Sequence, residues 1–210
     1  MAALPASLAE SERLFPYPES EIQRNAKRTW ILNYVPRGDA GAEIGAARGH
    51  FSEVLLQHLK PVRAYLVDPW TLRGTPAVAA GSVAGEVARQ EAHWRTERFT
   101  ETQCTFVQAA FPNGVELITE PLDWLYLDAT RDFDAALLEL QAAEKLLKPK
   151  GILFGDHWVP EPKSSRHGIF QAINKFTRSG KFEMVACGPY GQWAIRRRGP
   201  WKLKPEGGGD

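Results

Sequence analysis

Acidic residues stand where four of the predicted strands end. Glu43 closes the first strand and Asp68 the second, while Asp128 follows the fourth. The fifth strand is followed by Asp156 and His157. In open parallel sheets, ligands bind in the crevice beyond the carboxyl ends of the strands. One such acid has little meaning, but four strands of one sheet that end in this way predict a ligand site there.

The turn after the first strand has the spacing Glu-x-Gly-x-x-x-Gly, from Glu43 to Gly49. This differs from the Gly-x-Gly-x-x-Gly of a nicotinamide-binding turn. Gly45 allows the backbone to approach a ligand closely, and Gly49 allows the next helix to pack tightly on the sheet. Glu43 suits a cationic ligand better than a pyrophosphate, and Asp68 can accept hydrogen bonds from both hydroxyls of a ribose. The alternative is a glycine turn beside a surface aspartate, with no ligand.

These residues need a sheet to position them, and strand and helix patterns alternate along the chain as in folds with right-handed crossovers. Two late strands, 182–187 and 192–197, flank a Gly-Pro-Tyr-Gly turn and predict a hairpin with an antiparallel strand. The spacing of apolar residues predicts helices over 51–59, 83–99, 133–147 and 167–179, and strands over 42–44, 63–67, 105–108, 124–127 and 152–154.

The amino-terminal part predicts one further helix, over 21–34, with Ser20 as its N-cap. Its apolar residues have the spacing of an amphipathic helix: Ile22, Ala26, Trp30 and Ile31. Residues 1–20 hold three prolines and predict a loose lead-in. The glycine-rich piece 74–85 predicts a mobile segment. The region 74–99 is then either a lid over the substrate or an ordinary crossover helix.

Length and composition limit the class of protein. The 210 residues suit one domain, and 43% hydrophobic with 24% charged residues argues against global disorder. Lysine and arginine number 26 against 25 aspartates and glutamates. The resulting net charge of +1 argues against a nucleic-acid partner, because such proteins carry a clear basic excess. No apolar run approaches the roughly 20 residues that span a bilayer.

The expected compartment is the cytoplasm. Met1 to Glu10 lacks the basic start and the apolar stretch of a secretory signal. Cys104 and Cys187 lack metal-ligand spacing and fit free thiols in a reducing setting, with one disulfide as the alternative. We therefore expect a cytoplasmic protein without membrane contact. Its main domain spans 36–198, after a lead-in and helix over 1–35 and before a disordered tail over 199–210.

Four stretches of the chain, 43–52, 66–70, 122–128 and 146–156, resemble the motifs of class I methyltransferases that use S-adenosylmethionine. The resemblance covers roughly residues 39–197 and points to small-molecule O-methyltransferases of the macrocin and related sugar-modifying type. It implies a Rossmann-like α/β fold: a seven-stranded, mostly parallel sheet with helices on both faces and a carboxyl-terminal antiparallel hairpin. It also implies methyl transfer to a small hydroxylated acceptor.

The resemblance assigns roles to matched positions. Glu43 and the turn from Gly45 to Gly49 would hold the methionine end of the cofactor, and Asp68 the ribose. Where the family often has an acid after the third strand, this chain has Gln108 and Ala109 beside the adenine. The cofactor-binding residues implied are Glu43, Gly45, Ala46, Gly49, Ser52, Asp68, Pro69, Trp70, Gln108, Ala109 and Asp128.

The same resemblance raises a metal site. In the metal-dependent members, acids at the positions of Asp128 and Asp156 bind a divalent cation, and His157 would be the third ligand. Two carboxylates suit magnesium, and a histidine favours manganese, iron or zinc. The segment after Asp128 lacks the second acid and the histidine of the family. The alternative is that Asp156 and His157 only line the substrate pocket.

A hydroxyl acceptor must lose its proton, and His157 is the best-placed base, with Asp128 as the second catalytic residue. Three other functions stay open. They are a metal-dependent hydroxylase on the same scaffold, an RNA methyltransferase that uses the basic stretch from Arg196, and a non-catalytic cofactor-binding module. A homodimer through the amino-terminal helix also stays open.

Overall fold

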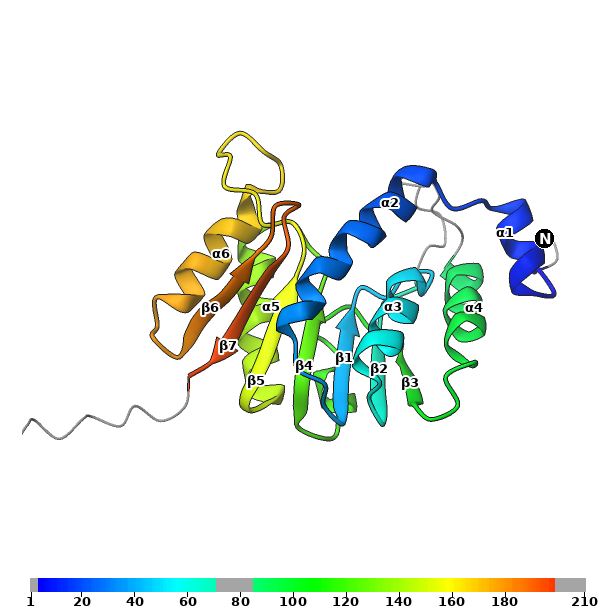
Figure 1. The fold of residues 1–210 in the computed structure, drawn as a ribbon, viewed down its shortest axis with the longest axis horizontal. Coiled ribbons are helices and arrows are strands. Elements are labelled where there is room, and N and C mark those ends of the chain that lie inside the picture. The colour runs from blue at the N-terminus through cyan, green and yellow to red at the C-terminus, as the bar shows by residue number, and fades with distance from the viewer. Residues whose placement is uncertain (1–3, 71–84, 199–210) are drawn as a thin grey trace, which may run out of the picture.

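The computed structural model describes residues 4–70 and 85–198. Its core is a seven-stranded sheet in the order β3-β2-β1-β4-β5-β7-β6 (Figure 1). β7 runs antiparallel to both of its neighbours, and the pairs among β1 to β5 are parallel. The predicted Rossmann-like sheet and the late antiparallel hairpin are therefore confirmed. The strands are β1 (Ala40–Ile44), β2 (Arg63–Val67), β3 (Gln103–Val107), β4 (Leu122–Leu127), β5 (Leu147–Gly155), β6 (Phe182–Cys187) and β7 (Trp193–Arg197).

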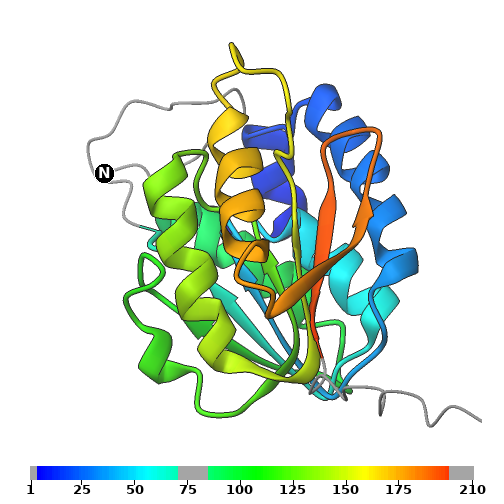
Figure 2. The same cartoon turned by 90° about the vertical axis from the view of Figure 1, so that its left-hand side faces the viewer.

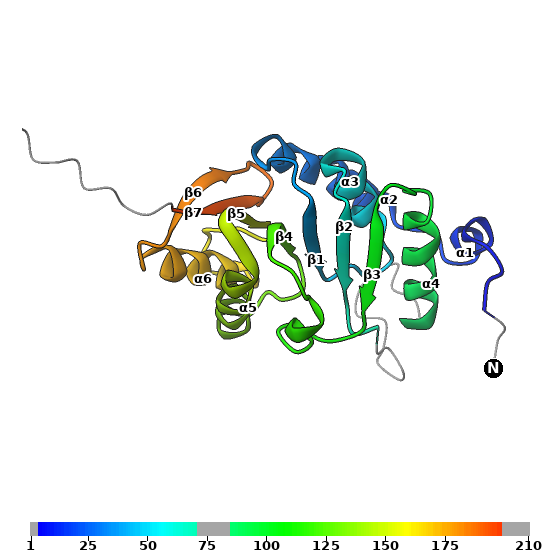
Figure 3. The same ribbon diagram turned by 90° about the horizontal axis from the view of Figure 1, so that it is seen from below.

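Helices cover both faces of this sheet. α2 and α3 lie on one face, and α5 and α6 lie on the other (Figure 3). α5 and α6 pack side by side (Figure 2). No helix among the described residues is long and apolar enough to cross a bilayer. The helices are α1 (Leu8–Leu14), α2 (Glu19–Arg28), the 3-10 helix η1 (Thr29–Tyr34), α3 (His50–Leu59), α4 (Gly85–Thr96), the 3-10 helix η2 (Val115–Leu117), α5 (Phe133–Leu146) and α6 (His167–Thr177).

The core has a layer on each side of the sheet, because side chains alternate along each strand. From β4, Trp124 and Tyr126 pack with Phe154 of β5 against η1 and α3. Leu125 and Leu127 point to the other side and pack against α5 and α6. This burial on both faces explains the nearly continuous apolar sequence of the central strands.

Strand register brings the predicted site residues to one edge. Ile44 of β1 pairs with Val67 of β2 and with Leu127 of β4, and Leu127 pairs with Gly155 of β5. Each of the last three is followed directly by an acid: Asp68, Asp128 or Asp156. Because the strands are parallel, all of these residues stand at the carboxyl edge of the sheet.

Two expectations for the amino-terminal part are wrong. Residues 8–14 of the predicted loose lead-in form α1, which begins where the Ser7 hydroxyl accepts the N–H of Glu10 (3.2 Å). The predicted helix over 21–34 begins at Glu19 after Pro18, and its last six residues form η1. Its inner face is polar as well: Arg28 is buried, whereas Ile22 is 48% exposed. The reason is that α2 lies over an acidic edge of the sheet.

Other boundaries differ less. β5 begins at Leu147 rather than Ile152, and residues 148–151 bulge out where the register with β4 shifts. The described part of the region 74–99 forms α4, which packs against α3 and α1. The expected mobile piece over 74–85 lies outside the described residues except for Gly85, which is the first residue of α4, and the expected tail over 199–210 lies outside them entirely.

Candidate functional site

The turn between β1 and α3 has left-handed backbone at three residues, with φ of 93° at Gly45, 46° at Ala47 and 77° at Gly49. A Cβ on Gly45 would stand 2.8 Å from the carbonyl oxygen of Asp128. Both the backbone angle and this close approach therefore require glycine. The turn lies directly against the end of β4, and the Gly45 N–H donates to the carbonyl of Val67 in β2 (2.8 Å).

Asp68 fixes the outer side of this turn. Its carboxylate accepts the N–H of Ala47 (3.0 Å) and the N–H of Trp70 (2.9 Å). The indole N–H of Trp70 donates back to the carbonyl of Ala47 (2.9 Å). Burial raises the pKa of Asp68, although the two N–H groups act in the opposite direction. Pro69 is half-buried between these two residues, and Trp70 is buried near Phe106.

Glu43 is a buried carboxyl at the end of β1. The hydroxyl of Ser52 in α3 donates to its Oε2. Burial nevertheless raises the pKa of Glu43 to about 8, more than the hydrogen bond lowers it. Glu43 forms no ion pair with another described residue. A cation that reached it would therefore relieve an unfavourable burial.

Three other predicted cofactor residues occupy different surroundings. Gln108 is exposed just beyond β3, with its Oε1 3.5 Å from Arg89 Nη1. Ala109 is half-buried and packs against the hydrophobic core. Ala46 is buried against α3 and α4 rather than open to a ligand.

The structure brings the side chains of Asp128, Asp156 and His157 together at the ends of β4 and β5. Each offers one ligand atom, and these atoms all lie within 4.8 Å of one another. His157 Nε2 is 3.0 Å from Asp128 Oδ1. His157 is buried and has a φ of 68°, a strained value for a residue other than glycine. The indole of Trp193 in β7 holds the neighbouring carbonyl of Asp156 (3.0 Å).

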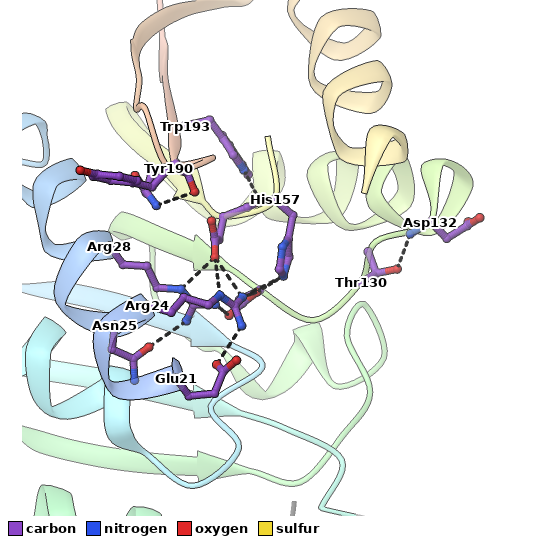
Figure 4. Close-up of polar contacts among 12 residues, drawn as sticks. Glu21, Arg24, Asn25, Arg28, Thr130, Asp132, His157, Tyr190 and Trp193 are labelled. Carbon is purple, nitrogen blue, oxygen red and sulfur yellow. Dashed lines mark hydrogen bonds and ion pairs between the residues drawn. The ribbon is translucent and has the colours of Figure 1, made fainter. Parts of the chain in front are cut away.

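Two arginines of α2 complete this cluster, and both were missed by the sequence analysis. Arg24 and Arg28 point from the helix toward His157 (Figure 4). Arg28 contacts Asp128 Oδ2 at 2.6 Å and Asp156 Oδ2 at 2.9 Å. Arg24 contacts Asp156 Oδ2 at 2.9 Å. The sequence feature that could have identified them is their spacing of four residues, because this spacing places two positive charges on one face of a helix.

The charges of the cluster set its protonation. Burial alone would raise the pKa of Asp128, but Arg28, His157 and Arg24 outweigh it and lower the pKa to about 2. Arg24 Nη2 lies 3.0 Å from the same His157 Nε2 that faces Asp128. A single ring nitrogen cannot accept from Arg24 and donate to Asp128 at once, so these contacts are alternatives set by the tautomer.

The amino-terminal segment is anchored beside the cofactor turn. Arg48, inside the turn, forms a buried ion pair with Glu91 of α4 and donates to the carbonyl of Phe15. The hydroxyl of Ser11 in α1 donates to the same Glu91. The Tyr17 ring stacks on His50 at 3.5 Å between centroids. The turn and the segment that leads to α2 therefore share one polar network.

Comparison with protein families gives a match over residues 42–158 to a family described as a methyltransferase domain. No curated protein matches the sequence.

Solved structures share the fold. An O-methyltransferase from Bacillus cereus in complex with SAH has a TM-score of 0.59 at 15% identity, over 94% of this chain and 93% of that chain. The O-methyltransferase TomG from Streptomyces achromogenes, involved in tomaymycin synthesis and solved with SAM, has 0.57 at 15%, over 94% and 91%. The N-methyltransferase NodS from Bradyrhizobium japonicum in complex with SAH has 0.58 at 19%, over 93% and 95%. At these identities the likeness concerns the fold.

Proposed function

Because the chain belongs to the family of methyltransferase domains, we propose that it transfers a methyl group from S-adenosylmethionine to a hydroxyl group of a small molecule. The observation that carries this proposal is the buried carboxyl of Glu43 beside the glycine turn. This carboxyl is buried and forms no ion pair with another described residue, so an ammonium group such as the amino group of the cofactor would stabilise its charged form.

The residues around Glu43 fit such a cofactor. Gly45 carries no side chain that would stand in the turn, and Asp68 has a half-buried carboxylate at the end of the neighbouring strand β2. A carboxylate in this position suits the two hydroxyls of a ribose. S-adenosylmethionine, when bound, supplies an activated methyl group on a sulfonium. The protein must then mainly position the acceptor and remove its proton.

His157 is the proposed base. When Asp128 accepts the N–H at Nε2, the lone pair of the ring is at Nδ1, a buried atom without a hydrogen-bond partner among the described residues, so the acceptor hydroxyl has to reach into the protein to meet it. The low pKa of Asp128 keeps it anionic, so it would stabilise the imidazolium that forms when Nδ1 takes the acceptor proton. Asp128 is thus proposed to orient and stabilise His157.

A metal ion does not fit the cluster as it stands. Both carboxylates are held by guanidinium groups, whose positive charges would repel a second cation. The proposed reaction therefore has no step through a metal, and the same contacts weigh against a metal-dependent hydroxylase. Production of S-adenosylhomocysteine would separate the two reactions.

The remaining alternatives receive less support. An RNA methyltransferase would need the basic stretch from Arg196 to contact RNA, but two of these arginines already contact other residues of the protein. Arg196 pairs with Glu183 (2.6 Å), and Arg197 donates to the carbonyl of Glu144. A non-catalytic module would bind the cofactor without turning over any hydroxylated acceptor. We keep a homodimer and a cytoplasmic location as expectations.

Calorimetric titration with S-adenosylhomocysteine at pH 7 tests the cofactor assignment. With a pKa of about 8, Glu43 is mostly protonated at this pH, and an ammonium beside it favours the carboxylate. Binding should therefore release close to one proton. The observed enthalpy should then differ between phosphate and Tris buffers, because the released proton is taken up by buffers with different heats of ionisation.

Glu43→Gln should remove that buffer dependence, and Asp68→Ala should weaken binding at least about tenfold, equal to ~1.4 kcal/mol. Glu116→Gln, far along the chain in η2, is the matched control and should change neither. Absence of binding in the wild type would refute the cofactor proposal. Proton release that persists in Glu43→Gln would refute the role given to Glu43.

A further inference from the structure

The acidic cluster of Asp128 and Asp156 already contains its cations. Arg28 reaches both carboxylates, and Asp156 Oδ2 accepts from Arg28 Nε and from Arg24 Nη2, each at 2.9 Å. Two guanidinium groups supply the charge of one divalent cation. They supply it permanently, because arginine is not deprotonated in proteins.

These arginines are held in place by the fold. Arg28 is buried, its Nη1 donates to Asn25 (3.3 Å), and its guanidinium lies over the ring of Phe51 in α3 at 5.4 Å. Arg24 is held from its outer side by Glu21 (3.0 Å). Because both residues belong to one helix, α2 brings the two charges to the strand ends together.

Beneath the guanidinium groups lies a set of donors that suits a metal. The ligand atoms of Asp128, Asp156 and His157 lie within 4.8 Å of one another and come from the ends of two adjacent strands. His157 is 3% exposed, and the ring nitrogen that faces the carboxylates is Nε2, which lies 3.0 Å from Asp128 Oδ1 and 3.0 Å from Arg24 Nη2. Two carboxylates and one imidazole form a donor set that manganese accepts.

We propose that Arg24 and Arg28 are the resident counter-cations of this cluster and that they mask a divalent-cation site made by Asp128, Asp156 and His157. The wild-type protein then binds no divalent cation there. With both guanidinium groups removed, the three side chains bind one Mn²⁺. The corollary that turnover needs no added metal rests on the proposed methyl transfer, but metal binding itself does not.

The test is a titration with Mn²⁺ followed by electron paramagnetic resonance, on the wild type and on Arg24→Met/Arg28→Met. The double variant should bind one Mn²⁺ at least about tenfold more tightly than the wild type, and Mn²⁺ should raise the Tm of the double variant only. Adding Asp128→Asn to the double variant should abolish this binding. Arg13→Met/Lys27→Met removes the same charge from α1 and α2 outside the cluster and should behave as the wild type.

Several outcomes would overturn the proposal. One is a wild type that binds Mn²⁺ as tightly as the double variant and loses it with Asp128→Asn. Another is a folded double variant, verified by circular dichroism, that binds no Mn²⁺. If the double variant does not fold, Arg24→Met alone should still gain Mn²⁺ affinity over the wild type, since this side chain is 25% exposed. No gain there would also refute the proposal. Failure of methyl transfer would leave these results unchanged.

Discussion

Glu139→Gln should stabilise the protein, and more so as the pH rises. Glu139 in α5 is 5% exposed and lines a cavity of ≈ 10 Å³, about the size of one water, behind Asp156. It has no hydrogen bond or ion pair with another described residue. Burial, and then the negative charge of Asp128, raise the pKa of Glu139 from 4.5 to about 8. Glutamine has a similar shape and cannot ionise.

The direction of the pH effect on stability follows from the number of protons that the folded and the unfolded protein bind. Between pH 4.5 and about 8, the folded protein keeps the Glu139 proton that the unfolded chain has lost. The free energy of unfolding of the wild type therefore falls as the pH rises through this window. At ~1.4 kcal/mol per unit of pKa, the whole shift is equivalent to about 5 kcal/mol. A domain of this size gains roughly 2–4 °C per kcal/mol, which predicts an increase in Tm of about 10–20 °C.

The assay is thermal unfolding of both proteins at pH 5 and pH 8.5. The quantity to compare is the variant's Tm minus the wild-type Tm, because Glu43 titrates in the same range in both proteins and cancels. Glu144→Gln is the matched control, since Glu144 lies on the same helix and pairs with Lys181 (3.1 Å). A difference for Glu139→Gln that stays constant between the two pH values would refute the reasoning.

Three further predictions concern the turn, the amino-terminal anchor and the base. Gly45→Ala places a Cβ 2.8 Å from the Asp128 carbonyl oxygen at a positive φ. The free energy of unfolding, measured by scanning calorimetry, should therefore fall by about 2–3 kcal/mol, and calorimetric titration should show weaker binding of S-adenosylhomocysteine. Glu91→Gln removes the negative charge of the buried Arg48–Glu91 ion pair, which should lower the free energy of unfolding in urea by about 3 kcal/mol and speed hydrogen exchange in α1. Unchanged exchange there would contradict the anchoring role. His157→Ala should lower turnover about 100-fold while affinity for S-adenosylhomocysteine, measured by titration, changes little; equal losses in both would count against the base.

The central fold could be predicted because its signals are local. β2 and β6 run over the predicted residues, since each is a short apolar run between turn residues. α1 was missed, because the prolines around residues 5–18 gave a stronger signal than the cap at Ser7. The buried face of α2 was misassigned for a different reason. Which face of a helix is buried depends on the surface that it packs against. For α2 this surface is an acidic strand edge more than 100 residues away in the sequence.

The candidate site divides in the same way. The proximity of Asp128, Asp156 and His157 could be expected, because parallel strands bring their carboxyl ends to one edge whatever the loops do. The presence of Arg24 and Arg28 there could not, because arginines on a charged helix usually face water, and no local pattern separates a solvated pair from a buried one. The roles of all these residues stay predictions until cofactor and acceptor binding are measured.

Because β7 runs antiparallel to its neighbours, it starts at the carboxyl edge of the sheet and ends near the opposite edge. This direction determines where a label can be attached without covering the candidate site. β7 starts at Trp193, which holds the Asp156 carbonyl at the site, and it ends at Arg197 near the opposite edge of the sheet. Four steps along the strand at ~3.3 Å each separate Trp193 from Arg197 by roughly 13 Å. A fluorophore or a sensor surface joined at position 198, directly after β7, would therefore stand away from the carboxyl edge of the sheet. An attachment through α1 would disturb the anchor that α1 forms with α4.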